Sequence, residues 1–292
     1  MNIFKKIRKE LTYTEVSPLL YTPGLQDAYS GISVTGGCLR GKHVVVTGGT
    51  GGIGFAIAKR YLDEGCYVTI SGRSKEKLES SLKQLDPSEL GKVDHVIMDQ
   101  LNPSSINKVL KNLFDEKDVD IWVNCADICT DTDKSRRFRG VDKQTYSSVM
   151  DTNLKSVKLI CELLAERWLS MKKKGQIINI ASICGIFPSF GQTSYGISKV
   201  QVASLTQQLS VKFRDKVVFT CVSPGSVATM MINRKIGDNL SRKRTMLTRH
   251  VALPEEIAAV VAFLSSPAGR IVNNSNISSQ YGMIKVSAAE TL

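Results

Sequence analysis

The sequence predicts an α/β protein in which one mostly parallel, doubly wound sheet carries helices on both faces. Short apolar or β-branched runs, typical of buried parallel strands, occur at residues 43–46, 67–71, 177–180 and 217–222. A glycine-rich turn follows the first run and leads into an amphipathic helical stretch. The 292 residues, 42% hydrophobic and 23% charged, are enough to bury a full core. This length suits one α/β domain with an extension, or two small domains.

The amino-acid composition limits the kinds of site and partner that we expect. Seven cysteines form no C-x-x-C pair and no metal-binding spacing with the three histidines, which lie far apart. We therefore expect reduced thiols in a cytoplasmic protein, with neither a disulfide framework nor a metal site. The 39 basic and 27 acidic residues give a net charge of +12, which suits nucleic acid, an anionic membrane surface or a phosphorylated ligand. No nucleic-acid-binding signature accompanies the charge, so an anionic small molecule or an acidic carrier is the expected partner.

Residues 1–40 stand apart from the rest of the chain. Ile3, Phe4, Ile7 and Leu11 recur at helical spacing among basic residues. This pattern predicts either a short interfacial helix or an arm that clasps another subunit. The segment lacks the apolar core and the cleavage site of a secretory signal. Prolines and glycines then interrupt the pattern, so we place an N-terminal arm at 1–40 and a single main domain at 41–292.

A dinucleotide-binding turn is predicted directly after the first strand, where residues 47–54 read T-G-G-T-G-G-I-G. Gly48, Gly52 and Gly54 permit, in that order, a tight turn, a close approach of the backbone to a pyrophosphate, and packing of the helix on the strand. Thr50 and Ile53 lie in the same turn and are counted with the cofactor-binding residues. The strand-turn-helix context favours dinucleotide binding over a purely structural turn.

The end of the second strand indicates which dinucleotide is bound. An enzyme that uses NAD usually has an acidic residue here, which bonds the ribose 2′-hydroxyl and would repel a 2′-phosphate. Gly72 holds that position, and the adjacent Arg73 and Ser74 can bind a 2′-phosphate. We therefore expect NADP (NADPH) as the cofactor. The alternative is that Arg73 only solvates a loop.

Tyr195, Lys199 and Ser182 form the predicted catalytic centre. If the segment after Gln192 is helical, the Tyr-Lys spacing places the phenol and the ammonium on one face, and the cation lowers the pKa of the tyrosine. A tyrosine tuned in this way can give a proton to a carbonyl oxygen or take it back. Ser182 follows the run at 177–180, at the carboxyl end of a strand, where α/β sheets bind ligands. Taken alone, the Tyr-Lys pair is equally well explained as an exposed pair on a helix.

Together, the S-x12-Y-x3-K and T-G-x-x-x-G-I-G motifs resemble those of the short-chain dehydrogenase/reductase family, and the resemblance extends from residue 41 to about residue 282. It implies a Rossmann-type sheet of seven strands in the order 3-2-1-4-5-6-7 and a homo-oligomer, dimer or tetramer. It also implies NADP-dependent interconversion of a carbonyl and a secondary alcohol. Tyr195 would be the general acid/base, Lys199 would bind the nicotinamide ribose, and Ser182 would hold the substrate oxygen. Asn153 would hold, through its backbone carbonyl, a water of the proton relay.

The resemblance assigns further cofactor contacts at the ends of the later strands. Asp99, with Gln100 beside it, would bond the adenine amino group, and Asp99 is also placed to cap the next helix. The remaining contacts are Asn124, Ala126, Pro224, Gly225, Val227 and Thr229. Asp127 departs from the family pattern N-N-A-G. Asp tolerates a positive φ better than most residues, and it adds a carboxylate near the cofactor cleft.

Two basic segments bear on the choice of substrate. The expected substrate lid at 230–250 has an excess of five positive charges, and Arg136, Arg137 and Arg139 form a second cluster. A substrate with a phosphate or a phosphopantetheine arm would be attracted by this charge, which makes a 3-oxoacyl-carrier-protein reductase the leading specific candidate. A solvated lid is the alternative interpretation of the segment.

Other functions remain open at this point. A reductase of a sugar, polyol or small ketone is the alternative among enzymes. From a different class, an NADP-binding scaffold or regulator without turnover is the alternative, and nucleic-acid binding rests on charge alone. The tail at 280–282 reads Q-Y-G where the family has D-G-G, which weakens the expectation of a tetramer.

Overall fold

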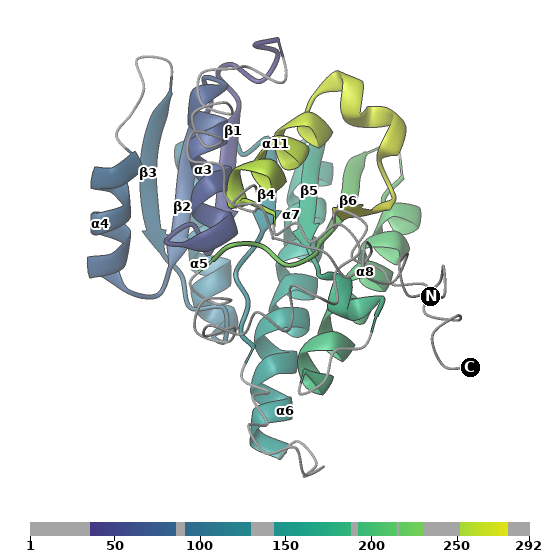
Figure 1. The fold of residues 1–292 in the computed structure, drawn as a ribbon. Helices are drawn as coiled ribbons and strands as arrows, with labels where there is room; N and C mark the ends of the chain where they lie inside the picture. The colour runs from purple at the N-terminus through teal and green to yellow at the C-terminus, as the bar shows by residue number, and fades with distance from the viewer. Residues whose placement is uncertain are drawn as a thin grey trace, which may run out of the picture.

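Seven strands form one parallel sheet in the order β3-β2-β1-β4-β5-β6-β7, as the sequence predicts. The computed structural model describes residues 36–85, 91–129, 143–187, 192–214, 216–229 and 252–279. The strands are β1 (His43–Thr47), β2 (Tyr67–Gly72), β3 (Lys92–Ile97), β4 (Ile121–Asn124), β5 (Gly175–Ile180), β6 (Val217–Pro224) and β7 (Asn276–Ser279). The fold class is therefore confirmed (Figure 1).

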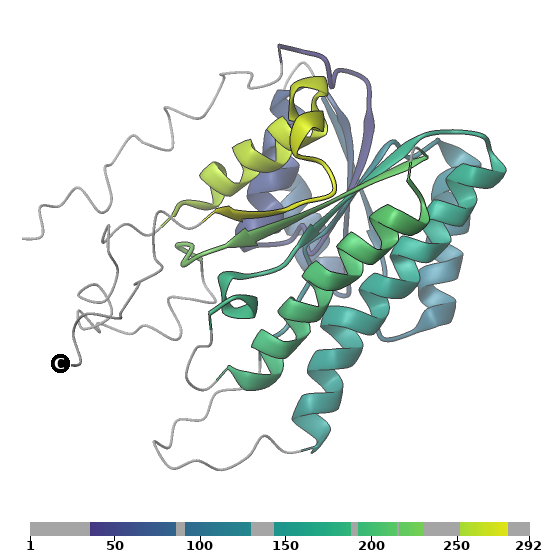
Figure 2. The same ribbon diagram turned by 90° about the vertical axis from the view of Figure 1, so that its right-hand side faces the viewer.

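Helices cover both faces of the sheet. The α-helices are α3 (Gly52–Asp63), α4 (Lys75–Leu85), α5 (Pro103–Glu116), α6 (Lys143–Met150), α7 (Ser156–Ser170), α8 (Thr193–Lys212) and α11 (Pro254–Ser265). Shorter helical segments are η2 (Asp151–Lys155), η3 (Ile183–Gly185) and η4 (Pro267–Val272). Apolar residues of α3, α4 and α11 pack into one core cluster, whereas those of α5, α7 and α8 pack into another. Figure 2 shows the corresponding layers, with the sheet between α3 and α11 on one side and α7 and α8 on the other.

The burial of each strand explains its sequence. All five residues of β1 are buried, and β5 and β6 are nearly so, because helices cover both sides of these central strands. The edge strand β3 is largely exposed or half-buried, which matches its mixture of charged and apolar residues. The opposite edge strand, β7, is short and polar. The apolar runs of the sequence thus mark the centre of the sheet.

The order of the strands positions the site. The order of the sheet reverses between β1 and β4, which pair in parallel, so the connections from these two strands leave on opposite faces. In open α/β sheets the crevice at the carboxyl ends of such strands binds ligands. Residues that follow β1, β4, β5 and β6 all lie at this edge.

Some expectations concern residues outside the described ranges. These are most of the arm at 1–40, the lid at 230–250, the cluster of Arg136, Arg137 and Arg139, and the tail at 280–282. Among the described helices, none is long and apolar enough to cross a membrane.

Candidate active site

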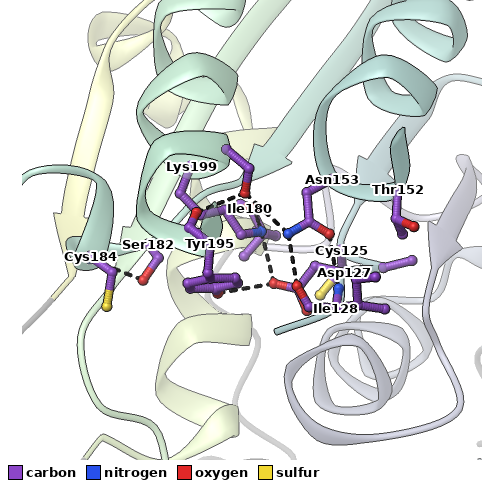
Figure 3. Close-up of polar contacts among 12 residues, drawn as sticks. Cys125, Asp127, Ile128, Thr152, Asn153, Ile180, Ser182, Cys184, Tyr195 and Lys199 are labelled. Atoms are coloured by element: carbon purple, nitrogen blue, oxygen red, sulfur yellow. Dashed lines mark hydrogen bonds and ion pairs between the residues drawn. The ribbon is translucent and has the colours of Figure 1, made fainter. Parts of the chain in front are cut away.

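Tyr195 and Lys199 lie one turn apart on α8 and are both buried, with 9% and 3% of their surface exposed. The ammonium of Lys199 donates to the backbone carbonyl of Ile180 at 2.9 Å, where β5 ends. It also forms an ion pair with Asp127, with 2.8 Å between Nζ and Oδ2. The predicted helical arrangement of the two side chains is thus present at the carboxyl edge of the sheet (Figure 3).

Asp127 joins the tyrosine to the lysine. The Tyr195 hydroxyl donates to Oδ2 of Asp127 at 3.0 Å, the same oxygen that Lys199 contacts. Burial, followed by the charge of Asp127 and its hydrogen bond, raises the pKa of Tyr195 well above the usual value of a phenol. The expectation that Lys199 makes Tyr195 unusually acidic is therefore wrong for this structure, because burial and the Asp127 carboxylate outweigh the effect of the cation.

The loop that carries Asp127 is fixed from two sides. The Thr47 hydroxyl, at the end of β1, accepts from the backbone N–H groups of Cys125 at 3.0 Å and Ala126 at 3.1 Å. On the other side, the amide of Asn153 bonds both the N–H and the carbonyl of Ile128, each at 2.9 Å. Asp127 is not among the described non-glycine residues with a positive φ, so it occupies this loop without backbone strain.

Asn153 lies in η2, a π-helical turn between α6 and α7. The sequence of residues 145–157 predicts one helix across this point. Besides Ile128, its side chain donates to the Ser198 hydroxyl of α8 at 3.1 Å. Single π turns inside helices are frequent at functional sites. Asn153 therefore ties the loop after β4 to the helix that bears Tyr195, while the role of its backbone carbonyl in a relay stays a prediction.

Ser182 follows β5 and caps η3, where its Oγ accepts from the backbone N–H of Cys184 at 3.1 Å. Among the described residues the hydroxyl hydrogen has no acceptor assigned to it, so it can serve another partner. Close packing holds η3 on α8, because a Cβ on Gly185 would lie 2.7 Å from the nitrogen of Val200. In the view of Figure 3, Ser182 and Asp127 lie on opposite sides of Tyr195.

The glycine-rich turn has the tight turn at Gly48 and the close helix packing at Gly54 that the sequence predicts. Gly48 has a φ of +69°, and a Cβ there would lie 2.8 Å from the Cα of Ala126. A Cβ on Gly54 would lie 2.3 Å from the carbonyl oxygen of Gly48, which shows how closely α3 packs on the turn. Gly52, with a φ of +53°, approaches the Thr229 side chain. The turn thus brings the predicted cofactor residues that follow β1, β4 and β6 together.

The residues after β2 have a mixed environment. Arg73 is exposed. A Cβ on Gly72 would lie 3.3 Å from the Thr50 side chain and would also contact Leu78. The Ser74 hydroxyl donates to the Glu76 carboxylate at 2.6 Å, a bond that lowers the pKa of Glu76. Arg73 is therefore accessible to an anion, whereas Ser74 must first leave its present partner.

Asp99 and Gln100 follow β3. The Asp99 carboxylate accepts from the N–H of Leu101 at 3.0 Å, and the side chain that caps α5 is Asn102, which the sequence interpretation missed. The Asn-Pro pair at 102–103, with a proline at the first helical position, was the available signal. The side-chain nitrogen of Gln100 is buried and has no hydrogen-bond partner among the described residues.

The remaining predicted cofactor residues lie after β4 and β6. The Asn124 side chain is buried, accepts from the Trp122 indole at 2.9 Å and donates to Asn179 at 2.8 Å, so it is held in the interior at the end of β4. Val227 is buried and pairs with Ala252, whereas Pro224, Gly225 and Thr229 lie at or beyond the end of β6. Within the described ranges, no three His, Cys, Asp or Glu side chains are grouped to hold a metal.

The site fits a nicotinamide dinucleotide. Glycines, which have no side chain, line the turn at the start of α3. The backbone N–H groups at this helix start suit a pyrophosphate. The buried side-chain nitrogen of Gln100, which has no hydrogen-bond partner within the described part of the chain, follows β3. Ser182, Tyr195 and Lys199 lie at the same edge of the sheet, so the expected catalytic residues and the nucleotide cradle are in reach of each other.

Comparisons with known proteins find relatives that match most of the chain. The profile described as short chain dehydrogenase matches residues 42–239. The 3-oxoacyl-(acyl-carrier-protein) reductase FabG of Chlamydia trachomatis is 31% identical over 251 residues, which cover 85% of this chain and 99% of the relative. The 3beta-hydroxysteroid dehydrogenase 1 of Eggerthella lenta is 30% identical over 255 residues, covering 84% and 94%. The crystal structure of a short chain dehydrogenase from Burkholderia cenocepacia in complex with NADP is similar, with a TM-score of 0.74, 25% identity, and coverage of 84% and 99%.

Proposed function

The chain belongs to the short-chain dehydrogenase family, oxidoreductases that act on CH–OH and C=O groups, and we propose that it reduces a carbonyl with NADPH through Tyr195. The observation that carries the proposal is the buried Tyr195 and Lys199 pair on α8 beside the glycine-rich turn. When bound, the reduced nicotinamide supplies the hydride. The hydroxyl of Tyr195 donates a proton to the carbonyl oxygen, and Ser182 holds that oxygen by donating its hydroxyl hydrogen.

Lys199 and Asn153 support the reaction in this proposal. Lys199 offers a buried ammonium next to the tyrosine, suited to bond the ribose hydroxyls of the cofactor. Asn153 holds the loop of Asp127 and bonds α8 through Ser198. Its predicted link to a proton relay belongs to the same proposal.

NADP rather than NAD is the proposed cofactor. Gly72 carries no carboxylate after β2, and the exposed Arg73 provides a guanidinium that matches a phosphate. The similar structure from Burkholderia cenocepacia holds NADP, which supports the same preference here. Glu76, whose carboxylate accepts a hydrogen bond from Ser74, opposes an added phosphate.

The proposed substrate is a 3-oxoacyl group on an acidic carrier. The net charge of +12 and the similarity to a 3-oxoacyl-(acyl-carrier-protein) reductase support it. The steroid dehydrogenase is about as similar to this chain, at 30% against 31% identity, so overall identity alone does not select the substrate. A small ketone, sugar or polyol is the alternative substrate, and a scaffold without turnover is the alternative from another class.

Replacement of Tyr195 by Phe tests the proposed reaction. Because general acid catalysis contributes roughly 100- to 10,000-fold, Tyr195→Phe should lower kcat for NADPH oxidation with an accepted ketone by that factor. NADPH binding, followed by fluorescence, should persist. Tyr146→Phe is the matched control, since Tyr146 is an exposed residue of α6. Undiminished turnover in Tyr195→Phe would refute the role, and NADPH binding without turnover of any carbonyl by the wild type would favour the scaffold.

A further inference from the structure

A single carboxylate oxygen contacts both side chains that are expected to carry the reaction. Oδ2 of Asp127 lies 3.0 Å from the Tyr195 hydroxyl and 2.8 Å from Nζ of Lys199. A carboxylate can only accept, so this hydrogen bond holds the proton on the tyrosine oxygen. An ammonium whose charge is compensated by a carboxylate also stabilises a phenolate less. The bridge therefore opposes ionisation of Tyr195 in two ways.

Asp127 is held in place, unlike a surface carboxylate. Only 17% of its side chain is exposed, and the residues before and after it are fixed by Thr47 and Asn153. Charges in such a position are screened much less than exposed ones. The effect of Asp127 on its two neighbours is therefore a built-in property of the loop after β4.

Among the other titratable groups around Tyr195, two cysteines act in the same direction as Asp127. Cys129, from the loop after β4, and Cys184, from η3, both raise the pKa of the tyrosine when ionised. Cys125 stays a neutral thiol, because burial raises its pKa to about 12. From α8 comes the cation of Lys199, which Asp127 neutralises.

We propose that Asp127 is a positioning residue that keeps Tyr195 in its proton-donating form, so that carbonyl reduction extends further into the alkaline range. The proposal rests on the function proposed above. In reduction, the carbon gains the hydride of NADPH, the carbonyl oxygen gains the proton of Tyr195, and the phenolate regains a proton from solvent. Reduction needs the phenol and oxidation needs the phenolate. If Tyr195 ionises at a higher pH, reduction therefore continues to a higher pH. The rate of oxidation likewise reaches its plateau at a higher pH.

The pH profile of kcat/KM for a carbonyl, at saturating NADPH, tests this role. In Asp127→Asn and Asp127→Gly, the alkaline decline of reduction should begin at least about one pH unit lower than in the wild type. At a pH above the onset of the decline in both proteins, kcat/KM of the variants should be about tenfold lower than that of the wild type. Alcohol oxidation should level off at a correspondingly lower pH. Asp151→Asn is the matched control, because Asp151 also pairs with a lysine, Lys155, but on a more exposed face.

A second measurement separates this proposal from the proposed function. The absorbance of tyrosinate during an alkaline titration, taken as the difference between each protein and its Tyr195→Phe counterpart, reports the ionisation of Tyr195 without turnover. It should occur at lower pH in both Asp127 variants than in the wild type. If no variant reduces any carbonyl, the function fails and this titration alone decides on Asp127. Unchanged titrations or unchanged pH profiles would overturn the proposal, and the near-isosteric Asn variant carries the test if the Gly variant does not fold.

Discussion

Arg73 is the residue on which the cofactor preference is expected to depend. It is exposed directly after β2, next to a glycine that has no carboxylate to repel a phosphate. Arg73→Ala should raise KM for NADPH about tenfold and leave KM for NADH unchanged, because a hydrogen bond to a charged group contributes on the order of 1.5 kcal/mol. Steady-state kinetics with both cofactors measures the difference.

The control for this change lies on the helix that follows. Lys83→Ala removes an equal charge near the end of α4, away from β2, and should leave both KM values as they are. A change in KM that is the same for NADPH and NADH in Arg73→Ala would argue against a contact with the 2′-phosphate.

At the scale of residues, the sequence predicted the arrangement of the central residues of the candidate site but not their electrostatics. Ser182, Tyr195 and Lys199 lie in one strand-loop-helix segment, so their spacing along the chain determines their arrangement in space. Asp127 was placed only near the cofactor cleft. Its bond to Tyr195 joins positions 68 residues apart and depends on how the loop after β4 packs on α8. Long-range contacts of this kind are decided by tertiary packing, which a motif does not encode.

At the scale of elements, two glycines of the same turn differ in the space that is left for a side chain. A Cβ on Gly54 would lie 2.3 Å from the carbonyl oxygen of Gly48, whereas a Cβ on Gly51 would meet nothing within 4 Å. Gly51 also has an extended φ of −179°, which any residue adopts. Gly54→Ala should therefore force α3 away from the turn, lower the free energy of unfolding by about 1–3 kcal/mol and weaken NADPH binding. Chemical denaturation and a binding titration measure these effects.

Gly51→Ala is the matched variant for this prediction. Replacing glycine by alanine at a helix N-cap costs up to about 1 kcal/mol, so its free energy of unfolding should fall less than that of Gly54→Ala. Equal stability of the two variants would mean that the close packing of α3 on the turn does not limit the fold.

The elements themselves were predicted to different degrees. The central strands were found because helices cover both of their faces, which demands continuous apolar runs. The π turn at η2 was not found, because residues 151–155 contain neither glycine nor proline and read as an ordinary helix. Its side-chain bonds reach Ile128 and Ser198, in other elements. The irregular turn therefore coincides with these hydrogen bonds to other parts of the chain, and not with a helix-breaking residue in its own sequence.

At the scale of the whole molecule, connectivity made the sheet predictable. Right-handed crossovers between parallel strands leave few possible orders, and the order with its reversal between β1 and β4 is the one observed. The distribution of charge is a different matter. The net charge of +12 is a property of the whole chain, and much of the local excess falls at 230–250, outside the described residues. The effect of this charge on the choice of substrate is therefore best tested by varying the salt concentration.

Salt should distinguish a carrier-linked substrate from a neutral one. The Debye length falls from about 10 Å at 0.1 M salt to about 3 Å at 1 M, so attraction between a basic enzyme and an acidic carrier is largely lost. At saturating NADPH, KM for a 3-oxoacyl carrier protein should rise several-fold over this range, while KM for a small uncharged 3-oxo ester changes little. Arg242→Glu with Arg244→Glu should raise KM for the carrier at low salt and reduce its salt dependence. An identical response of both substrates would show that the basic charge does not select an anionic partner.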